Sequence, residues 1–372
     1  MVSGLGHVRR RENALAYVRG LIEHQSHASL RPTLYESLQQ FIADSPWDPA
    51  LLVRACAERV APRLAVYAWV VDDIGIPKDG THSPGVKRQY SPDLGKIRNC
   101  QLTVSLHAVG ERGALPLGWA LYLPEEWCDD PRRRRKTKIP DEIAFRTKPA
   151  LARALCEEAA GWDVPRAPVL AGAAHGDEIG FRAGLDDSGL EYVAAVSPRT
   201  PVFAAGRVLA VEEQRIGTGS PPGVDRPEPG PEPIRSLAAR LPFHAWHAFP
   251  FRSAQTGRPA TTRFAIVRVT AARPAGTPGL TPHREWLIME WPYGRSAPTR
   301  YWLSNLSPDV SADRLAGLAH LGGNVEIDYR ELKGELGLDH YEGRSYRGFH
   351  HHCALVTCAH AFLTSERTDL DP

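Results

Sequence analysis

Three groups of side chains in this chain could do chemistry near neutral pH. Two adjacent carboxylates, Asp72 and Asp73, end a short run of apolar and β-branched residues. The imidazole of His175 suits a general acid or base, because histidine titrates near neutral pH. A dense basic run is either a solvated loop or a contact for phosphate groups, and it contains Arg132, Arg133, Arg134, Arg135, Lys136 and Lys138.

The composition restricts the classes of function. The formal net charge is only +2, so any contact with nucleic acid must come from local patches rather than from a global field. The six cysteines are widely scattered without a C-x-x-C pair, which argues against a zinc ribbon and a disulfide framework. The sequence has no signal-peptide pattern and no apolar run that approaches the span of a bilayer. We therefore expect a soluble, cytoplasmic protein without a membrane partner.

Hydrophobic periodicity indicates the elements that must position these side chains. Apolar residues recur at helical spacing through residues 8–65, which predicts a small N-terminal helical bundle. The pattern then changes to three strands followed by helix, strand, helix and strand, which is typical of a mixed α/β sheet with carboxylates at strand ends. The predicted strands and helices are, in order, 66–71, 100–109, 117–123, 143–160, 168–171, 177–188 and 192–196.

The second half of the chain predicts an insertion and a return to helix. Residues 217–235 are so rich in Pro and Gly that no regular structure is expected there. Strands at 263–269 and 286–291 make residues 200–300 a β-rich insertion, and helices are expected at 325–336 and 354–362. The predicted domains are an N-terminal helical domain at 1–65, a first core segment at 66–199, the insertion at 200–300 and a C-terminal helical core segment at 301–372.

Long motifs, in order along nearly the whole chain, resemble one family. They are Trp-Val-Val-Asp-Asp-Ile-Gly-Ile-Pro-Lys-Asp-Gly at 69–80, Leu-Gly-Lys-Ile-Arg-Asn-Cys-Gln at 94–101, and the block from Tyr329 to Arg344, which is followed by three histidines at 350–352. The chain resembles bacterial insertion-sequence transposases of the DDE class. The resemblance implies an RNase H-like core with a β-rich insertion, and a DNA-binding role for the N-terminal helices.

The resemblance also implies a metal site. Enzymes of this family cut and join DNA with two Mg²⁺ ions about 4 Å apart, held by two aspartates and a glutamate. Asp73 matches the first ligand and Glu326 matches the third. Lys333 follows Glu326 by two helical turns, which places both residues on the same face of a helix.

Two blocks depart from the family pattern. The family has Ala-Asp-Ala-Gly-Tyr-Gly-Asp where this chain has Ala-Gly-Ala-Ala-His-Gly-Asp at 171–177, so Gly172 stands where the second aspartate is expected and His175 replaces a tyrosine. Before Glu326 the family has a basic-aromatic-basic stretch, whereas this chain has Gly-Gly-Asn at 322–324. Asp177 is expected to cap the next helix, and the alternative is that Asp177 or His175 substitutes as a ligand.

These departures lead to three hypotheses about function. The first is a transposase-derived protein that binds duplex DNA, with strand transfer lost or impaired and Mg²⁺ bound weakly or not at all. The second is an active transposase with a substitute ligand. The third is a recruited, metal-independent enzyme that acts on a small molecule through His175, Asp73 or Glu326. The sequence leaves the oligomeric state open.

Overall fold

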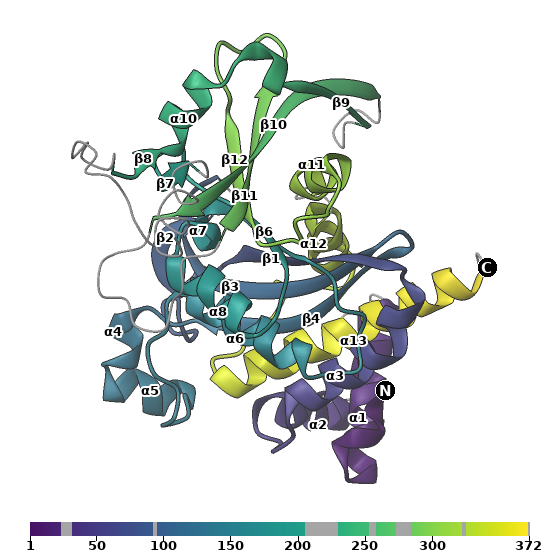
Figure 1. Cartoon of the computed structure of the whole chain (residues 1–372). Coiled ribbons are helices and arrows are strands. Elements are labelled where there is room, and N and C mark those ends of the chain that lie inside the picture. The colour runs from purple at the N-terminus through teal and green to yellow at the C-terminus, as the bar shows by residue number, and fades with distance from the viewer. Residues whose placement is uncertain are drawn as a thin grey trace, which may run out of the picture. The chain divides into compact units, whose positions relative to one another are not determined.

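The chain folds into two compact units, which are Met1–Ala167 together with Gly323–Pro372, and Pro168–Gly322. The structure is a computed structural model that describes residues 1–23, 32–91, 95–204, 230–252, 258–272, 284–321 and 325–370 (Figure 1). Within these ranges no helix is both long enough and apolar enough to cross a bilayer.

The first unit joins the N-terminal helices to the C-terminal helix. The long α13 packs against α1, α2 and α3, and also against β4 (Figure 1). The predicted N-terminal helices are confirmed, and α3 begins where Asp48 accepts a hydrogen bond from the backbone of Ala50 and Pro49 fills the first helical position. The helices of this unit are η1 (Val2–Leu5), α1 (Val8–Ile22), α2 (Pro32–Ala43), α3 (Pro49–Val60), η3 (Ala61–Arg63), α4 (Glu125–Cys128), α5 (Pro131–Thr137), α6 (Lys148–Ala160), α12 (Val325–Gly334) and α13 (Tyr346–Leu370).

The strands of the first unit are antiparallel and centre on one long strand. Its strands are β1 (Val66–Pro77), β2 (Lys87–Ser91), β3 (Lys96–Gly110) and β4 (Gly113–Tyr122). β3 pairs with β1 along most of its length, with β2 near its start and with β4 after that. α6 packs on β3 and β4.

The first strand extends beyond its predicted end. The prediction that this strand stops at Asp72-Asp73 is wrong, because Ile74 and Ile76 are buried and continue the pairing with β3 as far as Pro77. Asp73 therefore lies inside the strand, opposite Val104. A carboxylate at this position is surrounded by protein rather than water, so it needs a hydrogen-bonding or charged partner.

The basic run forms a helix, so the alternative that it is a loop is wrong. Residues 131–137 form α5, because Asp130 accepts hydrogen bonds from the backbone of Arg132 and Arg133 and Pro131 fills the first helical position. The helix predicted over 143–160 begins later, at Lys148, where Thr147 caps it and Pro149 favours a start. Both helix starts follow local capping chemistry.

The second unit is a sheet with helices beside it. The strand order is β5-β6-β12-β11-β10-β7-β8, and β9 also pairs with β10. β5 and β6 are parallel and the other described pairs of this unit are antiparallel, so the sheet is mixed. Its elements are β5 (Val169–Ala171), α7 (Ala173–Gly176), α8 (Ile179–Asp187), β6 (Tyr192–Ala195), β7 (Pro201–Ala204), β8 (Glu232–Pro233), α10 (Ile234–Arg240), η4 (Phe243–Ala245), β9 (His247–Arg252), β10 (Pro259–Ala271), β11 (Arg284–Pro292), β12 (Arg300–Ser304) and α11 (Ala312–His320).

Much of the core of the second unit lies on β10, β11 and β12, and β12 extends past the end of the predicted insertion at residue 300. Leu287, Met289 and Leu303 are fully buried there and pack with Trp246. The expectation that 217–235 has no regular structure is wrong at its end, because β8 and the start of α10 lie within it. Residues 217–229 and the Gly-Gly-Asn stretch at 322–324 lie outside the described residues.

The order of elements agrees with the fold expected from the resemblance. Antiparallel strands, then α6, β5, α8 and β6 follow one another as predicted. The four-domain division of the sequence stays a prediction, since the first unit combines residues from both ends of the chain.

Candidate functional site

The carboxylate of Asp73 already has a cationic partner. Its Oδ2 forms an ion pair with Nζ of Lys148, the first residue of α6. The side chain of Asp73 is 4% exposed and that of Lys148 is 25% exposed, so the pair is largely shielded from water. The backbone amide of Asp73 donates to the carboxylate of Asp72 at 2.8 Å. The ammonium of Lys148 therefore supplies a positive charge to the first acidic position.

Sequence reasoning missed Lys148, although one signal was present. A lysine at the first position of a helix lies at the positive end of the helix dipole, where a cation is unfavourable. Its presence there indicates a specific anionic partner. The identity of that partner depends on a contact between residues 75 positions apart, which no local pattern reveals.

The helix that carries the third predicted acid lies across the strands of the first unit. Nζ of Lys333 donates to the carbonyl of Gly75 in β1 at 3.0 Å. The hydroxyl of Tyr329 is hydrogen-bonded to Ser105 of β3, and its ring meets His107 edge-on at 5.4 Å. The backbone of Glu326 belongs to α12 as predicted, and its side chain lies outside the described residues. Two side chains of α12 thus reach β1 and β3.

Gly172 in the second unit offers space but no ligand. It follows β5 and begins α7, with φ −71°, a conformation open to any residue. A Cβ built at this position would meet no atom within 4 Å. The glycine is therefore not required by packing, and an aspartate would fit here. In this chain the second acidic position supplies no side chain.

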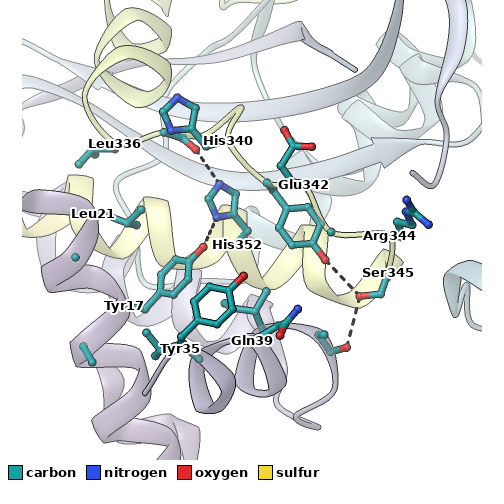
Figure 2. Close-up of a pocket in the computed structure, with 18 of the residues that line it drawn as sticks. Tyr17, Leu21, Tyr35, Gln39, Leu336, His340, Glu342, Arg344, Ser345 and His352 are labelled. Atoms are coloured by element: carbon teal, nitrogen blue, oxygen red, sulfur yellow. Dashed lines mark hydrogen bonds between the residues drawn. The ribbon is translucent and has the colours of Figure 1, made fainter. Parts of the chain in front are cut away.

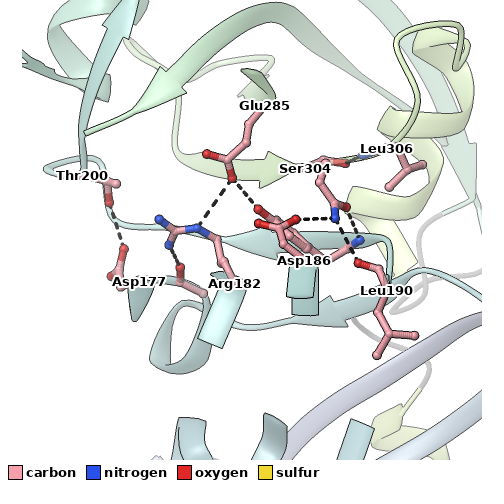
Figure 3. Close-up of polar contacts among 11 residues, drawn as sticks. Asp177, Arg182, Asp186, Leu190, Thr200, Glu285, Ser304 and Leu306 are labelled. Carbon is pink, nitrogen blue, oxygen red and sulfur yellow. Dashed lines mark hydrogen bonds and ion pairs between the residues drawn. The ribbon is translucent and has the colours of Figure 1, made fainter. Parts of the chain in front are cut away.

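The residues proposed as substitutes for the missing acid are engaged elsewhere. His175 is 2% exposed and its ring lies 5.8 Å from that of Phe181. The carboxylate of Asp177 accepts hydrogen bonds from the backbone of Ser197 at 2.6 Å and the hydroxyl of Thr200 at 2.9 Å (Figure 3). The expectation that Asp177 caps the following helix is wrong, because Glu178 occupies that position and accepts from Phe181.

A buried ionic network holds this part of the second unit in place. Arg182 of α8 and Glu285 of β11 form an ion pair at 3.7 Å with side chains that are 5% and 2% exposed (Figure 3). The hydroxyl of Tyr192 donates to Glu285 at 2.5 Å, and burial beside this carboxylate raises the pKa of Tyr192. Arg182 also donates to the carbonyl of Gly176. A side chain at position 176 would clash with β6, because its Cβ would lie 2.0 Å from a carbonyl oxygen of that strand. The scaffold around Gly172 therefore depends on close approach of α7 to β6.

Half of the predicted DNA-binding basic residues have structural partners. The guanidinium of Arg134 donates to the carbonyls of Ile143 and Pro140, each at 2.8 Å, and so closes the turn after α5. Arg133 lies over the ring of Trp127 at 4.9 Å and is 3.4 Å from the carboxylate of Asp130. Lys138 forms an ion pair with Asp44.

The other half of the basic residues remain exposed on α5. Within the described part of the chain, the side chains of Arg132, Arg135 and Lys136 have no hydrogen-bond or ion-pair partner. Unpaired exposed cations on one short helix are available to phosphate groups without loss of an internal contact. The usable basic patch is therefore these three residues, which we call the α5 patch.

Two of the positions that the family pattern assigns to metal ligands lack a free carboxylate. No group of three or more His, Cys, Asp or Glu side chains among the described residues is arranged to hold a metal ion. The carboxylate of Asp73 is neutralised by Lys148, and position 172 has no oxygen ligand. Hard divalent cations need several oxygen ligands, and the side chain of the remaining candidate, Glu326, lies outside the described residues.

Comparison with known proteins identifies the family. The model of the family described as "DDE superfamily endonuclease" matches residues 1–260. Over 164 residues the chain is 28% identical to a protein of Microchaete diplosiphon named "Probable transposase for insertion sequence element IS701". This match covers 43% of the chain and 40% of that protein, so it spans less than half of either. The α/β, RNase H-like fold is confirmed, and the chain belongs to the DDE superfamily endonuclease family.

Proposed function

We propose that this transposase-like chain binds duplex DNA and has lost metal-dependent strand transfer. The observation that carries the proposal is Gly172, an open position without a ligand where the family pattern has an aspartate. Two ions close together repel each other, and shared carboxylates must offset that repulsion. With one acid missing, the paired ions that activate the attacking oxygen and stabilise the leaving oxygen are not held together.

The ion pair at Asp73 supports the same conclusion. A divalent ion could bind this carboxylate only by displacing the ammonium of Lys148. That displacement would leave the ammonium without its anionic partner at a largely buried position, which is unfavourable. The first acidic position is therefore poorly available to a metal ion.

DNA binding is supported by the α5 patch and by the family. A DDE-family protein acts on DNA, and the α5 patch offers three free cations for phosphate contacts. Such contacts position a duplex but do not read its sequence. The proposal therefore names DNA as partner and assigns no target sequence.

The other two hypotheses have weaker support. A substitute ligand would have to come from Asp177, whose carboxylate holds the loop after β6, or from His175, which is buried. Small-molecule chemistry through His175 meets the same difficulty, because its ring packs against Phe181.

The test combines binding and cleavage on the full chain. Fluorescence anisotropy with a labelled blunt duplex should show binding that weakens as salt rises. In the same buffer with Mg²⁺ or Mn²⁺, supercoiled plasmid should remain unnicked. Efficient nicking in Mg²⁺ would refute the loss of catalysis, and failure to bind duplex DNA at low salt would refute the DNA-binding part.

A further inference from the structure

Two neighbouring cavities in the first unit share the residues Glu342 and Arg344. The larger, of about 910 Å³, lies between α1, α2 and the segment after α12, and we call it the aromatic cavity (Figure 2). The smaller, of about 310 Å³, lies beside the loop after β1, and we call it the polar cavity. Both sizes suit small molecular groups rather than a protein domain.

Aromatic rings line much of the larger cavity. Tyr17 of α1, Tyr35 of α2 and His352 of α13 face the cavity (Figure 2). The ring of Tyr341 stacks on His352 with centroids 5.6 Å apart, and Tyr17 meets His352 edge-on at 6.1 Å. These three rings pack against one another, and Tyr35, which is 41% exposed, is the ring that can stack against a planar aromatic ligand.

Hydrogen bonds hold three of the rings that line the aromatic cavity, those of Tyr17, Tyr341 and His352. The hydroxyl of Tyr17 lies 2.9 Å from Nδ1 of His352, whose Nε2 lies 3.0 Å from the carbonyl of Gly337. The hydroxyl of Tyr341 is 3.4 Å from that of Ser345. Such a wall is preorganised, so binding costs little ordering of the protein.

Basic and acidic side chains line both cavities, and the acidic ones at the aromatic cavity are Glu335 and Glu342. Lys136 and Arg344 line the aromatic cavity, and within the described residues neither side chain has an ion-pair partner. Arg344, His82 and Lys78 line the polar cavity, where Lys78 is held by the carbonyls of Asp339 and Tyr341.

Carboxylates limit how much negative charge the polar cavity accepts. Asp79 and Glu342 line it together with the three basic side chains. Burial lowers the pKa of Lys78, and the nearby Glu342 opposes that shift. Because acidic and basic side chains both line the polar cavity, it fits one phosphate group better than several phosphate groups in a row.

We propose that these cavities bind one unpaired nucleotide of a DNA strand, with its base in the aromatic cavity and its phosphate at the polar cavity. The inference rests on the proposed DNA binding, and it adds a site for an unpaired nucleotide at the end of a DNA strand. Lys136 belongs both to the α5 patch and to the wall of the aromatic cavity, so a strand on that patch leads directly to the opening. Base stacking with a phosphate contact is how proteins hold single strands without reading sequence.

The experiment compares two labelled DNAs on the full chain. One is a blunt duplex, and the other is the same duplex with a short single-stranded 3′ extension that carries 2-aminopurine. The extension should increase affinity, and 2-aminopurine fluorescence should be quenched on binding. Tyr35→Ala should reduce the affinity for the extended duplex about tenfold and leave the blunt duplex unchanged.

Matched variants separate stacking from a loss of fold. Tyr35 is 41% exposed, and Tyr90, which is 56% exposed and lines neither cavity, serves as control through Tyr90→Ala. Tyr35→Phe should retain the affinity, because the ring remains. Arg344→Gln should weaken binding of the extended duplex more than the exposed control Arg112→Gln does.

The outcomes distinguish this inference from the proposed function. Equal affinity for the two DNAs, with normal binding of the blunt duplex, would overturn the nucleotide site and leave DNA binding intact. Loss of both DNAs in Tyr35→Ala but not in Tyr90→Ala would overturn it as well. Binding of free deoxyadenosine monophosphate as tightly as the extended duplex would exclude a DNA strand as the occupant.

Discussion

Gly172 lacks the carboxylate that the family pattern has at this position. Gly172→Asp should leave the free energy of unfolding within about 0.5 kcal/mol of its original value, because the new Cβ meets nothing within 4 Å. Aspartate also suits the start of α7. The added carboxylate should raise Mn²⁺ affinity about tenfold, as measured by isothermal titration calorimetry.

A second glycine provides the control for this substitution. Gly317→Asp, in α11 of the same unit, also adds a carboxylate where a Cβ has open space. If both variants gain the same Mn²⁺ affinity, the gain is a general charge effect. If neither gains any, the assignment of position 172 to the ligand set is wrong.

Lys148 contributes to stability as the counter-ion of Asp73. Lys148→Met should lower the free energy of unfolding by about 2 kcal/mol, between the values for exposed and fully buried pairs, because the shielded carboxylate loses its cation. Urea denaturation measures the change. Lys148→Arg should retain most of the stability. In Asp73→Asn, the further substitution Lys148→Met should have a much smaller effect, and an undiminished effect there would refute the pairing.

At the residue scale, the sequence indicated candidate positions but not the partners of their side chains. Asp73, Lys333 and Gly172 were assigned to the site from motif matching, and that assignment stays a prediction, while the structure places Lys333 against β1. Lys148 was missed because its partner is distant along the chain. Arg134 resembled its neighbours in composition, and only the turn after α5 shows that its guanidinium holds carbonyl groups. The side chain of Glu326 lies outside the described residues, so its role stays a prediction.

At the element scale, α13 depends on buried histidines near its start. His351 contacts the carbonyls of Ile42 and Trp47, while His352 links α13 to Tyr17 of α1. Burial lowers the pKa of His352 to about 4 from its ordinary value of 6.5. The packing of α13 against the N-terminal helices therefore requires an uncharged imidazole.

The lowered pKa of His352 predicts a loss of stability in mild acid. The unfolded chain takes up this proton near pH 6.5 and the folded chain only near pH 4, so the stabilisation is complete above the first value and falls as pH drops towards the second. The slope contributed by this group should be about 1.4 kcal/mol per pH unit. Urea denaturation at about pH 7 and about pH 5 should show a smaller difference for His352→Gln than for the original chain. The exposed His244→Gln should not reduce that difference.

Elements with their own periodicity or caps were predictable, whereas those formed by pairing were not. The helices near the N-terminus and the strands β10 and β11 follow apolar patterns, and the predictions for them are confirmed. β2 has a polar sequence and forms because β3 extends past β1 to pair with it. α5 has no apolar stripe, and the Asp130-Pro131 cap was its only local signal.

At the scale of the whole molecule, the two units combine segments that the sequence separates. α13 belongs with α1, α2 and α3, although more than half of the chain lies between them. Hydrophobic periodicity cannot predict this packing, because it shows that a helix has an apolar face but not which other helix that face contacts. The predicted domain boundaries at 65, 199 and 300 were therefore based on sequence patterns. The compact units are instead defined by which segments contact one another in the fold.

The net charge of the whole molecule makes the source of DNA affinity testable. A chain with a formal net charge of +2 has no strong global attraction for DNA, so binding must depend on local phosphate contacts. Three contacts from the α5 patch correspond to a slope of about −2.7 in log K against log salt. Replacement of Arg132, Arg135 and Lys136 by glutamine should bring that slope close to zero and weaken binding at low salt.

A control variant with the same change of net charge separates the effect of the α5 patch from the effect of total charge. Glutamine at the exposed Arg235, Arg295 and Arg314 of the second unit changes the net charge by the same amount. Because a local contact releases its own counter-ions, this control should leave the slope near its original value. An equal loss of slope in both triple variants would show that total charge governs binding, and it would remove α5 from the DNA surface. Circular dichroism of both variants would establish that neither slope reflects unfolding.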